Sequence, residues 1–158
     1  MIDIYPQDAN VYNPTLDTLV ENIMAGEERP ELLNLIREIE SDNNPLARNK
    51  TTTASGVYQF TKDSVITAKN RAKNLGFDKG FVNLIPNDPT QWTDKESDIM
   101  ITANLFAQET DKPGFVDELL EQALQGNRQA MQDVYYMLHH TAPDEATKKR
   151  VNKIMPLK

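Results

Sequence analysis

Glu40 is the side chain of this sequence best placed to do acid–base chemistry, because it closes an amphipathic helix predicted over residues 30–41. With ~100° per residue and Leu32 at zero, Glu40 falls near ~80°, on the apolar side that Leu32 shares with Ile36. Glu31 and Glu38 fall near ~260° and ~240°, on the opposite face. A carboxyl against apolar surface at a helix C-terminus resists ionisation, so we expect a raised pKa that suits a general acid. The alternative from periodicity alone is a side chain that extends into solvent at a frayed helix end.

Three sequence blocks beside and beyond Glu40 bear on the choice between these two alternatives. The blocks are Glu40-Ser41 with Asn44-Pro45, then Gly56-Val57-Tyr58-Gln59-Phe60, then residues 136–146 with His139-His140. Their order and separation resemble those of the soluble lytic transglycosylases and the goose-type lysozymes, in particular phage members of that group. The likeness spans about residues 30–146, and its third block is the loosest, with Ala142 and Asp144 where glycines are usual.

The resemblance implies an all-α, lysozyme-like helical bundle with a substrate cleft, interrupted at most by a short hairpin. It also implies cleavage of peptidoglycan between N-acetylmuramic acid and N-acetylglucosamine, with Glu40 as the catalytic acid and base. Four residues are carried over as substrate-binding. Ser41 would hydrogen-bond locally at the helix end, and Gln59 would line the cleft near the sugar. Tyr58 would stack on a sugar ring or simply pack, and His139 would hydrogen-bond the sugar or Glu40, or merely end a helix.

A second carboxylate would decide between two chemistries. Most glycoside hydrolases use two, whereas the lytic transglycosylases that this chain resembles use one glutamate and close a 1,6-anhydro ring. Asp42, Asp63, Asp94 and Asp98 are the candidates, and no sequence feature directs any of them to the cleft. We therefore favour the single-glutamate route over hydrolysis.

Helical periodicity and capping residues supply the elements that must position these groups. Asn13-Pro14 opens a first helix that Gly26 ends, and Thr61 caps a helix that Gly76 ends. Residues 46–60 read as a loop with a short strand or hairpin, and residues 77–92 as an ordered loop pinned by apolar side chains. Further helices are expected over residues 93–110, 115–125 and 127–140 and after Pro143, the first of them opened by a Thr93–Glu96 capping box.

Composition excludes several other classes of protein. The 158 residues carry a formal net charge of −7, and the short basic run at residues 148–150 is too small for a nucleic-acid interface. There is no cysteine, and His139-His140 on a regular helix would not share one metal ion, so we expect no metal and no cofactor. We expect one globular domain, with a lead-in and first helix over residues 1–29 and a catalytic part over residues 30–158.

The first residues lack the basic and apolar regions of a secretory signal, and no apolar run approaches membrane-spanning length. Together with the phage-type blocks, this favours a phage virion protein that acts on the host cell wall or periplasm during entry. The expected partners are peptidoglycan glycan strands and tail or internal virion proteins. The alternatives are an endolysin for host lysis, a bacterial wall enzyme of a conjugation or secretion system, a non-catalytic phage structural module of the same fold, and a peptide-binding scaffold.

Overall fold

The computed structural model describes residues 14–107, 115–140 and 143–157, and within these ranges the chain is all-α, as predicted. The expected lead-in, the Asn13 cap and the end of the 93–110 helix lie outside the described residues. The helices are α1 (Pro14–Met24), α2 (Glu31–Ser41), α3 (Lys62–Asn74), α4 (Lys79–Leu84), α5 (Asp94–Ala107), α6 (Phe115–Leu124), α7 (Arg128–Val134) and α8 (Glu145–Ile154), with shorter helical turns η1 (Pro89–Gln91) and η3 (Tyr135–His139).

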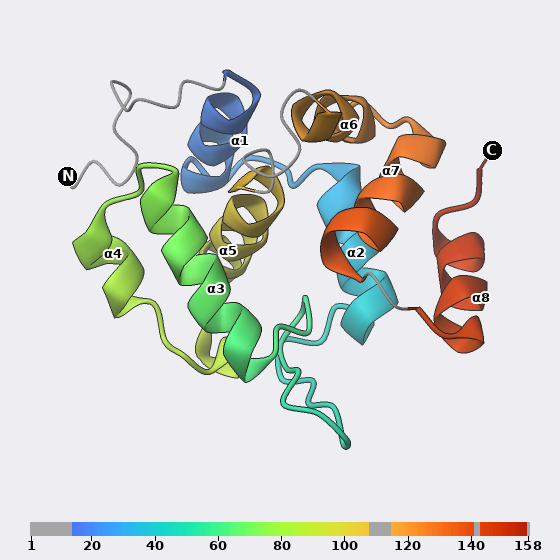
Figure 1. The fold of residues 1–158 in the computed structure, drawn as a ribbon, viewed down its shortest axis with the longest axis horizontal. Helices are drawn as coiled ribbons and strands as arrows, with labels where there is room; N and C mark the ends of the chain where they lie inside the picture. The colour runs from blue at the N-terminus through green and yellow to red at the C-terminus, as the bar shows by residue number, and fades with distance from the viewer. Residues whose placement is uncertain (1–13, 108–114, 141–142, 158) are drawn as a thin grey trace.

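Helix α5 forms the centre of the core. Its residues 97–106 are all buried, because apolar side chains leave the helix in every direction, which is typical of a helix surrounded by others. Helices α1 and α3 pack against α5, and the apolar side chains of α1 belong to the same hydrophobic core as those of the other helices. In Figure 1, α3 and α4 lie on one side of the molecule, and α2, α7 and α8 lie on the other.

Capping side chains start two of the helices where the sequence predicts. Thr61 accepts a hydrogen bond from the Ser64 backbone N–H, and the Ser64 hydroxyl accepts one from Thr61 N–H, which forms a reciprocal box at the start of α3. Thr93 and Glu96 form the predicted box before α5.

The region 77–92 differs from the prediction, because it contains the short helix α4 and the turn η1 instead of a plain loop. The sequence did not predict α4 because Asp78, whose side chain caps this helix, is equally common in loops.

The predicted 127–140 helix changes its winding before it ends. Helix α7 is regular, but η3 is a π-helical turn, in which the His140 N–H bonds the carbonyl of Tyr135, five residues earlier, at 2.7 Å. In an α-helix, side chains five residues apart point ~140° away from each other. The wider π turn brings such side chains to the same side of the helix. Tyr135 and His140 therefore face the same region of the molecule.

Residues 46–60 form a folded loop with two isolated antiparallel bridges, Arg48 with Ser55 and Ser55 with Phe60, and no strand within the described ranges. Gly56 has a φ of +78° and lies against Pro89, so a side chain there would meet Pro89 Cβ at 2.9 Å. Gln59 also has a positive φ, of +54°. The loop is tied to the end of α2 because the Ser41 hydroxyl lies 2.9 Å from the carbonyl oxygen of Val57.

Candidate active site

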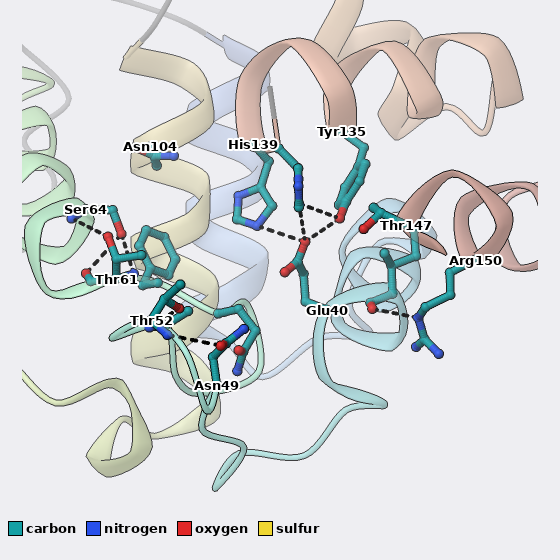
Figure 2. Close-up of a pocket in the computed structure, with 15 residues that line it drawn as sticks. Glu40, Asn49, Thr52, Thr61, Ser64, Asn104, Tyr135, His139, Thr147 and Arg150 are labelled. Atoms are coloured by element: carbon teal, nitrogen blue, oxygen red, sulfur yellow. Dashed lines mark hydrogen bonds and ion pairs between the residues drawn. The ribbon is translucent and has the colours of Figure 1, made fainter. Parts of the chain in front are cut away.

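A groove of about 600 Å³ opens between the two sides of the molecule, and Glu40 points into it (Figure 2). One wall comes from the end of α2, from η3 and from α8. The other comes from the 46–60 loop, the start of α3 and α5. The lining residues are Ile39, Glu40, Asn49, Thr52, Ala54, Gln59, Phe60, Thr61, Ser64, Asn104, Tyr135, His139, His140, Thr147 and Arg150.

Glu40 is held through one of its two carboxylate oxygens. Its side chain is 11% exposed, and the Tyr135 hydroxyl donates a hydrogen bond to Oε1. The His139 Nε2 and His140 Nδ1 atoms each lie 3.7 Å from the same Oε1. No described residue bonds Oε2. One oxygen therefore orients the carboxyl group, and the other is left for a ligand.

The acceptors around the two imidazoles fix where their protons lie. His139 Nε2 is 3.1 Å from the carbonyl oxygen of Tyr58, which only accepts, so this nitrogen carries a hydrogen. The Tyr135 hydroxyl uses its single proton on Glu40. Its 3.3 Å contact with His140 Nδ1 therefore requires an N–H on that ring atom as well. Each ring therefore carries an N–H on the nitrogen nearest the carboxylate, 3.7 Å from Oε1.

The expected rise in the pKa of Glu40 is wrong. Burial is the largest influence and raises this pKa, as expected. The hydrogen bond from His140, the charge of His139 and the hydrogen bond from Tyr135 together outweigh it, and the pKa of Glu40 lies below its usual value. Helix periodicity predicts the apolar surroundings of this carboxyl group. Tyr135, His139 and His140 come from a segment about a hundred residues away, and the sequence shows no link between that segment and Glu40.

The pKa values of His139 and Tyr135, two neighbours of Glu40, shift in opposite directions from each other. Burial lowers the pKa of His139 and outweighs the favourable charge of Glu40, so the ring is neutral near pH 7. Burial and the adjacent Glu40 charge raise the pKa of Tyr135, which keeps its hydroxyl proton at any physiological pH. The site thus holds an ionised carboxylate beside a neutral His139 and a neutral Tyr135.

Two of the four predicted substrate-binding residues line the groove. His139 does so beside Glu40, and Gln59 does so from the folded loop, with its Nε2 donating to the carbonyl of Gly56 at 2.9 Å. Ser41 lies outside the groove. Its hydroxyl is within hydrogen-bond distance of the carbonyls of Arg37 and Val57, which is the local role expected at the helix end.

Tyr58 does not reach the groove, so the prediction that its ring meets a sugar is wrong. The side chain is 1% exposed, and its hydroxyl donates to Asp98 Oδ1 at 2.6 Å and accepts from Arg37 Nε at 3.0 Å. Arg37 is itself buried and forms an ion pair with Asp98 at 2.7 Å. Since this pair needs a further polar partner away from water, it holds the Tyr58 hydroxyl inside the core.

Tyr135, His140 and Arg150 are groove residues near Glu40 to which the sequence assigned no role in the site. Arg150 Nε donates to the carbonyl of Ile39 at 3.1 Å, and its Nη2 donates to the carbonyl of Glu38 at 2.7 Å. It thereby joins α8 to the last turn of α2. A tyrosine five residues before a histidine is the signal for the Tyr135–His140 pair, and it is informative only once a π turn is known.

None of the candidate second carboxylates is among the described residues that line the groove. Asp98 is bound by Arg29 and Arg37, the carboxylate of Asp94 pairs with Arg37, and Asp42 pairs with Arg150 at 3.0 Å. Glu40 is the only carboxylate in the described lining. Across the described ranges, no group of three or more metal-ligating side chains is placed to hold an ion, and no helix is long and apolar enough to cross a membrane.

Comparison with known proteins adds no relative. No protein-family model matches the chain, and no curated protein and no solved structure matches it at the significance required.

Proposed function

We propose that this protein cleaves peptidoglycan glycan strands between N-acetylmuramic acid and N-acetylglucosamine, with Glu40 as the acid and then the base. The observation that carries the proposal is the placement of Glu40. It is the only carboxylate in the described lining of a groove of about 600 Å³, it is mostly shielded from water, and its Oε2 has no partner among the described residues. The sequence blocks around Glu40 and Gln59 support peptidoglycan as the glycan.

The acid step requires a proton on Glu40 Oε2. The donors to Oε1 keep the free carboxyl group ionised, whereas burial opposes ionisation and is already the largest influence on its pKa. A sugar bound over Oε2 removes the remaining water and strengthens that influence, without displacing Tyr135 from Oε1. Glu40 therefore takes up its proton as the substrate binds.

The proposed reaction needs no second carboxylate. The Oε2 proton passes to the glycosidic oxygen, the bond from that oxygen to C1 of N-acetylmuramic acid breaks, and N-acetylglucosamine leaves with a new hydroxyl. The Glu40 carboxylate then removes the proton of the 6-hydroxyl as O6 bonds to C1. The products are a 1,6-anhydro end and a protonated Glu40, and no water is consumed.

The test is Glu40→Gln, assayed by release of soluble muropeptides from purified peptidoglycan. We expect a loss on the order of 10²–10⁴-fold, the usual contribution of a general acid. Glu38→Gln is the matched control, because Glu38 lies on the same helix turn but is exposed and outside the groove lining. Mass spectrometry of the wild-type products identifies the chemistry. Anhydro ends support the proposed route, and reducing ends indicate hydrolysis by a muramidase. Glycan binding without any cleavage indicates a non-catalytic module.

We further propose that the setting is a phage virion, with the enzyme acting on the host cell wall or periplasm during entry. The phage-type sequence blocks that contain Tyr58-Gln59-Phe60 and His139-His140 support this setting over an endolysin. Purified particles that carry the protein and clear peptidoglycan, with slower entry in a Glu40→Gln phage, are the expected results. Normal entry with delayed host lysis would favour the endolysin.

A further inference from the structure

The wall of the groove that comes from the 46–60 loop and the start of α3 presents hydrogen-bond donors. Asn49, Thr52 and Thr61 lie together on this side, across from Tyr135 and Glu40 (Figure 2). Asn49 Oδ1 accepts from the backbone N–H groups of Thr51 and Thr52 and from the Thr51 hydroxyl, at 2.8 to 3.1 Å. Three donors on one atom fix which way the amide points.

The two threonines use their oxygen atoms as acceptors in the same way. Thr52 Oγ1 accepts from the Ala54 N–H at 3.1 Å, and Thr61 Oγ1 accepts from the Ser64 N–H at 3.1 Å. Neither hydroxyl proton, and neither hydrogen on Asn49 Nδ2, has an acceptor among the described residues. What remains on this wall is a neutral set of donors.

Gln59 supplies the opposite polarity from the same loop. Its Nε2 donates to the carbonyls of Gly56 and Ala47, at 2.9 and 3.4 Å, which uses both of its hydrogens. Its Oε1 has no donor among the described residues, and Gln59 lines the groove. The loop therefore offers fixed donors and one fixed acceptor next to the site of cleavage.

We propose that this loop wall binds a secondary amide of the substrate. Asn49, Thr52 and Thr61 donate to its carbonyl oxygen, and Gln59 Oε1 accepts from its N–H. A neutral donor set suits an amide carbonyl, whereas carboxylates are bound best by cationic donors. This inference rests on the proposed function, and a peptidoglycan strand has two sources of such amides: the acetamido group of each sugar and the peptide stem.

The experiment uses Asn49→Asp, which keeps the Oδ1 acceptor that holds the turn and replaces the donor by a second acceptor. Asn127→Asp is the matched control. Asn127 is also an exposed residue whose Oδ1 accepts from a nearby backbone N–H, but it caps α7 outside the groove lining. kcat/KM is measured on three glycans: untreated strands, chemically N-deacetylated strands, and strands freed of peptide by an amidase.

On untreated strands, we expect Asn49→Asp to lower kcat/KM about tenfold, the effect of losing one hydrogen bond to substrate. The defect should disappear on N-deacetylated strands if the bound amide is an acetamido group, and on peptide-free strands if it belongs to the stem. Asn127→Asp should match the wild type on all three. A defect of the same size on every glycan, or no defect on any, would overturn the inference.

Failure of the proposed function looks different, because the wild type would then cleave none of the three glycans. Thr52→Ala provides a second donor removal, at an exposed position where the loss of one local hydrogen bond leaves the fold intact. We expect this variant to lower kcat/KM on untreated strands and to lose that defect on the same treated glycan as Asn49→Asp. Circular dichroism spectra that match the wild type show that the changes in rate come from substrate recognition.

Discussion

Tyr135→Phe removes the one hydroxyl that donates directly to Glu40, and its effect can be worked out from the structure. The Tyr135 ring is buried and has room for phenylalanine, so the loss is confined to the hydroxyl's contacts. These are the hydrogen bond to a charged, 11% exposed carboxylate and the longer, 3.3 Å contact with His140 Nδ1. Such bonds contribute about 1.5–3 kcal/mol. His140 Nδ1 stays 3.7 Å from the same oxygen and retains part of the interaction. We therefore expect Tyr135→Phe to lower the free energy of unfolding by about 2 kcal/mol at pH 7.

This cost should depend on pH in a defined direction. The folded-state pKa of Glu40 is below its ordinary value of 4.5, so its ionised interactions stabilise the fold above pH 4.5 and are lost as pH falls through the lower folded value. The variant has less of this stabilisation to lose. Urea unfolding of both proteins from pH 7 to pH 3 should show the difference shrinking below pH 4.5. A difference that is constant across this range, or absent at pH 7, would refute the assignment of Tyr135 as the donor to Glu40.

Two further outcomes follow from burial and from backbone geometry. Burial lowers the pKa of His139 below 6.5, so the wild type should lose stability as pH falls below 6.5. In urea unfolding, His139→Gln should remove that part of the loss. If the unfolding free energies of the two proteins fall in parallel between pH 7 and pH 5, this expectation is contradicted. Gly56→Ala should destabilise the fold by about 1–3 kcal/mol more than Gly126→Ala. Both glycines have a positive φ, but only a side chain at position 56 would meet Pro89, at 2.9 Å. Equal melting temperatures for the two variants would show that the 46–60 loop moves to accommodate the added methyl group.

The fold could be predicted from the sequence wherever a local pattern decides the structure. Thr61 and Thr93 start helices because their hydroxyls accept from backbone N–H groups three residues on, an interaction contained within four residues of chain. Glu40 could be placed beside the groove because α2 is a regular helix and its apolar stripe marks the inner side. In each case the information lies within one element, and the tertiary structure leaves the local preference unchanged.

The sequence-based predictions fail where a contact with another element decides whether a side chain is buried. The ring of Tyr58 fits a cleft or a core equally well by composition, and it is buried because Arg37 and Asp98 need a hydroxyl between them. Arg37 itself is charged and sits one position from Ile36, so helix periodicity gives no reason to bury it. The buried ion pair explains both placements, yet its members are 61 residues apart in the sequence.

The lowered pKa of Glu40 also depends on partners from another element. Those partners reach Glu40 because of the winding of a single turn. A regular helix over residues 127–140 would point Tyr135 and His140 about 140° apart, and only one of them could reach Glu40. The π turn η3 lets both approach Oε1 together with His139, while Oε2 stays open to the groove. The extra residue in this turn thus brings in the neighbours that lower the pKa of Glu40, which burial alone would raise. Under the proposed mechanism, it makes protonation of Glu40 depend on the sugar that covers it.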